Sequence, residues 1–339
     1  MIWSKRKKRI LFAAFTVIAV FLLIEIICRV LSLPDTILVT YHGKRVDGDA
    51  GHVFNVEDPF LMWRPRPNYN SHFHINSDGL RDREFDRKKP PGTFRVFCLG
   101  DSTTFGINLD DVNGGYHKML ERKLMDAAKP GQTFEVINGG VTGYTAMQGL
   151  AMYRRVGRKY SPDVVTAYFG INDANRYYHL DDRQILATGG EISKGLQKGV
   201  LYHSALYKTL RGLVLKSREP EEKKKVPRVS LEDFPQILLE LNREVVADGG
   251  TLVLIATPVC PPNYNEDGVA RAAKYRQKVI ETAKNNDLPL LFVPELTEIA
   301  PFENIADYFG DGVHLNERGH AYLANRLYDL LRARHLLPD

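Results

Sequence analysis

The fold of this chain is decided by one stretch, which reads Phe94-Arg95-Val96-Phe97-Cys98-Leu99-Gly100-Asp101-Ser102-Thr103-Thr104-Phe105-Gly106. Its first six residues form a short, mostly apolar run between the Pro91-Gly92 pair and Gly100, a pattern typical of a buried strand. Gly100 permits a sharp turn at the end of that strand. Ser102 is therefore expected just beyond the carboxyl end of a strand, where open α/β sheets bind their ligands. A nucleophile and an ordinary helix cap both fit a serine at this place.

Strand-like and helix-like patterns alternate from this stretch to the C-terminus. Four further strands are expected, at residues 134–137, 163–169, 251–256 and 290–293. Helical patterns lie between and after them, at residues 116–128, 145–159, 231–248, 269–286 and 317–334. Such alternation predicts a parallel sheet of about five strands that is covered by helices on both faces.

The alternation breaks at an insertion, residues 174–230, that carries no clear strand. Within it, residues 219–228 are charged and flanked by prolines, which predicts a solvated loop. The part from 177 to 203 is a candidate cap over the cleft, because a long insertion in a folded domain is often functional. Before the first strand, residues 63–67 are expected to be extended, and residues 73–81 to form a short strand and a turn.

An apolar segment near the N-terminus, Ile10–Cys28, is interrupted only by Thr16 and Glu25. Its length of about 19 residues is near the lower end for a membrane-spanning helix. A basic cluster, residues 5–9, precedes it and by the positive-inside rule holds the N-terminus in the cytoplasm. Since no small-residue cleavage pattern follows, an uncleaved anchor is favoured over a signal peptide. Glu25 and Arg29 are spaced four residues apart and are expected to pair.

These features divide the chain into four parts. They are a basic cytoplasmic tail (1–9), a membrane anchor (10–31), an approach segment (32–92) and a main domain (93–339) that holds the insertion. The expected location is a bacterial inner membrane with a single pass, which places the main domain in the periplasm or outside the cell.

Charge and cysteine content exclude several classes of protein. The net charge of +5 is accounted for by residues 1–32, which hold six basic residues and one acidic residue, so the rest of the chain is neutral. A neutral main domain argues against nucleic-acid binding. The three cysteines, Cys28, Cys98 and Cys260, provide neither a disulfide framework nor a metal-binding spacing, and Cys98 is expected to be buried. No metal and no cofactor are expected.

Polar motifs recur just after the expected strands. They are Asn138-Gly139-Gly140-Val141-Thr142-Gly143, Gly170-Ile171-Asn172-Asp173 and, before the last helix, Asp311-Gly312-Val313-His314. Each motif alone is compatible with a turn, a helix cap or a fragment of a metal site. Because the carboxyl ends of parallel strands meet at one edge of the sheet, these motifs and Ser102 are expected to lie together.

Together these residues supply the parts that acyl transfer requires. Ser102 is a weak nucleophile that needs a base, and His314 is the candidate base because imidazole titrates near neutral pH. Asp311 can bond the other ring nitrogen and orient the imidazole. The candidate donors to an oxyanion are the N–H groups of Ser102 and Gly140 and the side-chain amide of Asn172.

The four motifs resemble the four sequence blocks of the SGNH (GDSL-type) hydrolase superfamily. Gly100-Asp101-Ser102, Gly140 within Asn-x-Gly-x-x-Gly, Gly170-x-Asn172-Asp173 and Asp311-x-x-His314 occur in the family's order, from Arg95 to the C-terminus. One departure is Thr103, where leucine or isoleucine is commoner. No Gly-x-Ser-x-Gly occurs in the chain, which disfavours an ordinary α/β-hydrolase.

The resemblance implies a flavodoxin-like three-layer α/β/α sandwich. The apolar anchor and residues 76–81 are similar to membrane-anchored bacterial members of the superfamily. The expected function is a membrane-anchored extracytoplasmic serine esterase that hydrolyses O-acyl esters, chiefly O-acetyl esters, on cell-surface glycans through an acyl-enzyme. Three alternatives stay open: an O-acetyltransferase with the same triad, a lysophospholipase, and a non-catalytic envelope scaffold.

Overall fold

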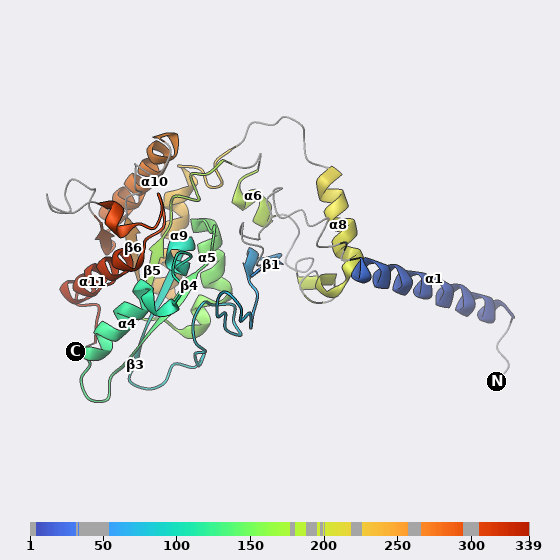
Figure 1. Ribbon diagram of the computed structural model, residues 1–339, viewed down its shortest axis with the longest axis horizontal. Helices are drawn as coiled ribbons and strands as arrows, with labels where there is room; N and C mark the ends of the chain where they lie inside the picture. The colour runs from blue at the N-terminus through green and yellow to red at the C-terminus, as the bar shows by residue number, and fades with distance from the viewer. Residues whose placement is uncertain are drawn as a thin grey trace.

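A computed structural model describes residues 5–31, 33, 54–176, 180–187, 195–196, 199, 201–217, 226–256, 266–293 and 305–338. Its centre is a parallel sheet of five strands in the order β4-β3-β5-β6-β7 (Figure 1). The strands are β3 (Thr93–Gly100), β4 (Thr133–Gly140), β5 (Val164–Tyr168), β6 (Thr251–Ala256) and β7 (Leu290–Phe292). All five expected strands are confirmed.

Helices cover both faces of this sheet, which makes the three-layer sandwich that the sequence predicted. On one face pack α5 (Ala146–Arg155), α9 (Asp233–Ala247) and α10 (Glu266–Asn285), and on the other α4 (Tyr116–Asp126) and α11 (Glu317–Ala333). Alternate residues of β3 serve the two sides: Phe97 and Leu99 face the first helices, and Val96 and Cys98 face the second. Cys98 is fully buried, as expected.

The approach segment forms a hairpin of β1 (Asn55–Asp58) and β2 (Met62–Pro65), which confirms the extended backbone expected near residue 63. The strand expected at residues 73–81 is wrong, because this region holds only an isolated bridge between Asn70 and His74. The cause is Asn76, whose side-chain oxygen accepts the N–H groups of Asp78 and Leu80 and folds the backbone into turns.

Among its described residues, the insertion includes the helices α6 (Asp182–Ala187) and α8 (Ala205–Ser217). The prediction of a solvated loop at residues 219–228 is wrong at its end, because the side chain of Arg228 is 4% exposed and pairs with Asp182. Residues 218–225 lie outside the described residues. So do residues 177–179, 188–194, 197–198 and 200, and the cap expected there stays a prediction.

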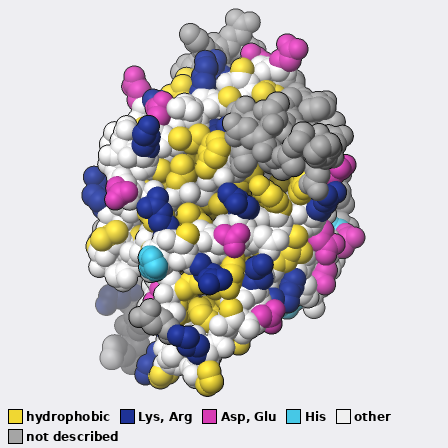
Figure 2. Space-filling view, turned by 90° about the vertical axis from the view of Figure 1, so that its left-hand side faces the viewer, with side chains coloured by type: hydrophobic (Ala, Val, Ile, Leu, Met, Phe, Trp, Pro, Cys, Tyr) yellow, Lys and Arg dark blue, Asp and Glu magenta, His cyan; other side chains and the backbone are white. Residues whose placement is uncertain are grey.

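One helix, α1 (Lys5–Val30), extends away from the sandwich (Figure 1). It is long and apolar enough to cross a membrane, with a mean hydropathy of 2.9 over its most apolar window, a property that it shares with signal sequences. The expected pair of Glu25 and Arg29 is present, with 2.6 Å between Oε1 and Nη2. Figure 2 shows the end of the molecule opposite α1, where basic and acidic side chains are intermixed, in keeping with the neutral main domain.

The remaining elements are short. They are the helical turn α3 (Ser102–Phe105) and the 3-10 helices η1 (Val112–Gly114), η2 (Gly157–Tyr160), η3 (Leu201–His203) and η5 (Ile305–Tyr308).

Candidate active site

Ser102 is the first residue of α3, which begins directly after β3 at the carboxyl edge of the sheet. Asp101 caps this turn, because its carboxylate accepts the N–H of Thr103 at 2.9 Å. Two glycines make room for the turn: a Cβ on Gly100 would overlap the side chain of Thr104, and one on Gly140 would overlap the backbone of Phe105. The turn that bears Ser102 therefore crosses directly over the ends of β3 and β4.

Ser102, His314 and Asp311 form one hydrogen-bonded chain. Ser102 Oγ lies 2.7 Å from His314 Nε2, and His314 Nδ1 lies 2.7 Å from Asp311 Oδ2. Because an ionised carboxylate only accepts, the ring proton belongs on Nδ1, which leaves Nε2 free to accept from the serine hydroxyl. The structure thus brings Ser102 to a histidine that lies 212 positions away in the sequence.

Asp311 lies in a tight turn that is held by hydrogen bonds from the residues that follow it. Its Oδ1 accepts the backbone N–H groups of Val313 and His314, each at 2.7 Å, and Asn108 donates to its Oδ2 at 3.3 Å. Partial burial alone would raise the pKa of this carboxyl, but the bonds from the His314 ring and the two N–H groups outweigh it and lower the pKa to about 2. The group is therefore ionised throughout the neutral range.

Asn172 is joined to the turn that bears Ser102. Its Nδ2 donates to Asp101 Oδ2 at 3.1 Å, while its Oδ1 accepts from Asn175. Asp101 is buried, and desolvation raises the pKa of its carboxyl to about 6 despite the bonds that it accepts. Since one hydrogen of the Asn172 amide is bound to Asp101, the second hydrogen is the one available to a ligand.

The N–H of Gly140, one of the expected oxyanion donors, is already occupied: it donates to Asn138 Oδ1 at 3.0 Å. Gly143 lies three residues further on with φ at +75°, a conformation that favours glycine. Within the described part of the chain, the N–H of Gly143 has no hydrogen-bond acceptor. Sequence analysis passed over Gly143, although it is the second glycine of the Asn-x-Gly-x-x-Gly motif.

The loop that carries Gly143 is braced by two distant parts of the chain. From the hairpin, Trp63 Nε1 donates to the carbonyl of Thr142 and Asn55 Nδ2 donates to its hydroxyl, both at 3.0 Å. From the insertion, Arg228 donates to the carbonyl of Gly143 and bonds Asp182 through two nitrogens. Neither brace was foreseen from the sequence.

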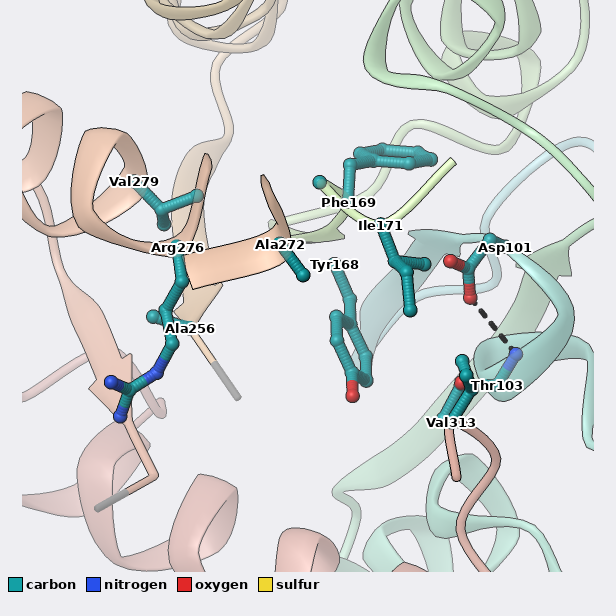
Figure 3. A pocket seen from close by; sticks show the side chains of 11 residues that line it. Asp101, Thr103, Tyr168, Phe169, Ile171, Ala256, Ala272, Arg276, Val279 and Val313 are labelled. Carbon is teal, nitrogen blue, oxygen red and sulfur yellow. Dashed lines mark hydrogen bonds between the residues drawn. The ribbon is translucent and has the colours of Figure 1, made fainter. Parts of the chain in front are cut away.

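A pocket lies beside the turn of Ser102 (Figure 3). Asp101 and Thr103 line one side of it, α10 contributes Ala272, Arg276 and Val279 on the other, and Tyr168, Ile171 and Val313 lie between. Its lining combines apolar side chains with the polar side chains of Asp101, Thr103 and Arg276. Within the described residues, no cluster of three His, Cys, Asp or Glu side chains is arranged to hold a metal ion.

The parallel sheet and the hydrogen-bonded serine, histidine and aspartate at its carboxyl edge define the class of α/β serine hydrolases. Within that class, residues 98–322 match the model of the GDSL-like Lipase/Acylhydrolase family, and the chain belongs to this family. It is thus an SGNH-type hydrolase that acts on ester bonds.

Solved structures of similar fold include a lipase/acylhydrolase from Enterococcus faecalis, at 18% identity and a TM-score of 0.49 over 71% of this chain and 96% of that chain. Another is Axe2, an acetylxylan esterase from Geobacillus stearothermophilus, at 18% identity and a TM-score of 0.45 over 70% and 94%. TesA matches at 18% identity and a TM-score of 0.46 over 72% and 99%. No curated protein sequence matches the chain.

Proposed function

We propose that this chain is a membrane-anchored, extracytoplasmic serine esterase that hydrolyses O-acetyl esters on cell-surface glycans. The observation that carries the catalytic part is the chain from Ser102 Oγ through His314 to Asp311, with both contacts at 2.7 Å. The apolar run of α1 and the basic cluster in the first turns of the same helix support the anchoring. The glycan substrate is proposed from that location, because esterified glycans are exposed at a cell surface; the membrane lipids are esters as well, and the comparison of ester chain lengths below distinguishes the two.

The proposed reaction uses Ser102 as the nucleophile. Its Oγ attacks the ester carbonyl while His314 Nε2 accepts the hydroxyl proton, and His314 then gives that proton to the departing alcohol. The acyl group stays on Ser102 as an ester. Water attacks this acyl-enzyme, again with His314 as the base, and releases the free acid and the serine. Asp311 stabilises the imidazolium that forms in both steps.

The tetrahedral intermediates require donors to their oxyanion. We assign this role to the N–H of Ser102, to the Asn172 amide hydrogen that Asp101 leaves free, and to the N–H of Gly143 in place of that of Gly140. The choice of Gly143 rests on its unbound N–H and on the bond that already occupies Gly140.

The test is hydrolysis of 4-nitrophenyl acetate and of longer-chain esters by the full chain in detergent. Ser102→Ala should abolish turnover, while Ser71→Ala, at an exposed serine, should leave it unchanged. Restriction to acetate supports a deacetylase. A preference for long chains would redirect the proposal to lipids, and transfer of acetate to a sugar faster than to water would make the enzyme an acetyltransferase. Equal turnover by the Ser102→Ala variant would contradict the mechanism.

A further inference from the structure

The exposed apolar side chains outside the anchor concentrate in the insertion. Beyond residue 31, the described part of the chain exposes seven large apolar side chains: Met125, Leu180, Leu196, Leu210, Leu213, Val246 and Phe292. Four of the seven belong to the insertion. Leu210 and Leu213 are about half exposed, at 52% and 47%, and their spacing of three residues places them on one face of α8. Helix α8 therefore carries an apolar face that the rest of the described protein does not cover.

The N-terminus of α8 is fixed to the anchor helix. Glu25 of α1 accepts the Ser204 hydroxyl at 3.0 Å and the N–H groups of Ala205 and Leu206 at 2.9 and 2.8 Å. Arg29, which pairs with Glu25, also donates to the carbonyl of His203. The first turn of a helix leaves its N–H groups unpaired and favours a negative charge. Ser204 caps α8 by accepting the N–H of Tyr207, and Glu25 of the anchor completes this cap and holds α8 at the level of Glu25.

The level of Glu25 is close to one end of the apolar run. Cys28, the last residue of that run, is three positions after Glu25, which corresponds to about 4.5 Å along a helix axis. From this point α8 runs across the axis of α1 rather than along it (Figure 1). If α1 spans a bilayer, α8 starts where the hydrocarbon meets the headgroups and extends along that boundary. Amphipathic helices that lie in this plane place their apolar side chains among the upper acyl carbons.

We propose that α8 is an interfacial helix whose occupant is the phospholipid of the outer leaflet, with Leu210 and Leu213 buried among the acyl chains. This proposal rests on the proposed anchoring by α1 and goes beyond it. The catalytic domain then contacts the membrane at two places, the span and α8. The insertion links these two membrane contacts to the active site, because its Arg228 donates a hydrogen bond to the carbonyl of Gly143.

The test uses the full chain in phospholipid vesicles, with Cys28→Ala and Cys260→Ser so that only the buried Cys98 remains. Single cysteines that carry an environment-sensitive fluorophore replace Leu210, Leu213, Ile18 of α1, or Val246, an exposed apolar residue of α9 that serves as the matched control. The expected result is that lipids bearing a quencher near the headgroup remove most of the emission at positions 210 and 213. The probe at 246 should stay sensitive to aqueous iodide alone.

The probe in α1 separates failure of this proposal from failure of the anchoring. Quenching at position 18 by lipids labelled near the bilayer centre, without lipid quenching at 210 and 213, overturns the α8 proposal and leaves the anchor intact. No lipid quenching at any position overturns both. Protection of 210 and 213 from iodide and from lipid quenchers alike means that protein covers the face, which also overturns the proposal. Glu25→Ala should weaken lipid quenching at 213 and leave position 18 unchanged.

Discussion

At the scale of single residues, Asp101 is the point at which two parts of the active site meet. One of its carboxylate oxygens accepts the N–H of Thr103 and so fixes the turn of Ser102. The other accepts the amide of Asn172 and so fixes a proposed oxyanion donor. Asp101 is thus a positioning residue, and its burial, which raises its pKa to about 6, is the cost of that position.

Asp101→Asn should lower kcat with little change in KM. An asparagine there presents its NH₂ group to the NH₂ group of Asn172, and two donors repel, so the Asn172 amide turns away from the oxyanion. We expect a smaller loss than the roughly 10²–10³ typical of deleting one oxyanion donor. Kinetics with 4-nitrophenyl acetate test this, with exposed Asp126→Asn as the control. An unchanged kcat would show that Asp101 does not position Asn172.

His314→Ala should cost more activity than Asp311→Asn, because the histidine transfers the proton and the aspartate orients it. Losses of about 10⁶ and about 10⁴ in kcat, respectively, are expected by analogy with other serine triads. Circular dichroism must show that both variants are folded. Equal losses in folded proteins would contradict the assignment of Asp311 as the orienting group.

His117 makes the fold sensitive to acid. It is fully buried on α4, neither ring nitrogen has a hydrogen-bond partner in the described protein, and burial together with the nearby Lys118 keeps its pKa well below the usual value. A depressed pKa means that protonation favours the unfolded chain, so stability is full above pH 6.5 and falls as the pH decreases. At pH 5 the loss of stability from this group is at most about 2 kcal/mol, the limit set by the pKa of about 6.5 in the unfolded chain.

His117→Phe should remove that part of the pH dependence. Denaturant unfolding at pH 7.5 and pH 5 measures it for both proteins, and the difference between the two pH values should be smaller in the variant. Its matched control is the exposed His74→Phe, which should behave as the parent does. A variant with the same pH dependence as the parent would mean that His117 is protonated in the folded protein.

At the scale of elements, a buried ion pair inside the insertion holds the arginine that joins the insertion to the sandwich. Arg228 and Asp182 have side chains 4% and 0% exposed, and Arg228 also reaches the carbonyl of Gly143 and the side chain of Gln148. Arg228→Ala leaves Asp182 buried without its partner, which typically costs 3–5 kcal/mol, roughly. Because the same change releases the loop of Gly143, kcat should fall as well.

Thermal unfolding and esterase kinetics together test the role of Arg228. The comparison is Arg154→Ala, which removes a surface cation that pairs with Glu240 and Glu244 and should cost at most about 1 kcal/mol with normal kcat. Arg228→Lys retains the charge but not the forked geometry and should fall between the two. A stable Arg228→Ala variant with normal kcat would contradict the expectation that Arg228 stabilises the fold and positions the loop of Gly143 for catalysis.

Sequence reasoning succeeded where the structure depends on local patterns and failed where it depends on distant partners. Apolar runs bounded by glycine or proline located all five strands of the sheet, and the spacing of Asp311 and His314 located their pair. The burial of Arg228 depends on Asp182, 46 positions away, and no local pattern reports it. The order of glycines likewise does not reveal that Asn138 already binds the N–H of Gly140.

At the scale of the whole molecule, α1 stands apart from the packed layers. None of its residues belongs to the hydrophobic clusters of the sandwich. If it is an uncleaved anchor, the full chain should resist extraction from membranes by alkaline carbonate and yield only to detergent. A protein that lacks residues 1–31 should be released and should hydrolyse 4-nitrophenyl acetate at the parental rate. Extraction of the full chain by carbonate would indicate a removable leader instead.

If α1 is the proposed membrane anchor, the bonds from Glu25 to the start of α8 change what that anchor does. A flexible anchor limits only how far the enzyme lies from the membrane, so the enzyme can reach esters at many distances from the bilayer. Because the start of α8 is hydrogen-bonded to the span, the span also fixes an orientation. The height and tilt of the active site above the membrane are then set by the fold. Exchange of α1 for an unrelated span of equal length should keep the protein on the membrane, but the catalytic domain should lose its fixed orientation relative to that membrane.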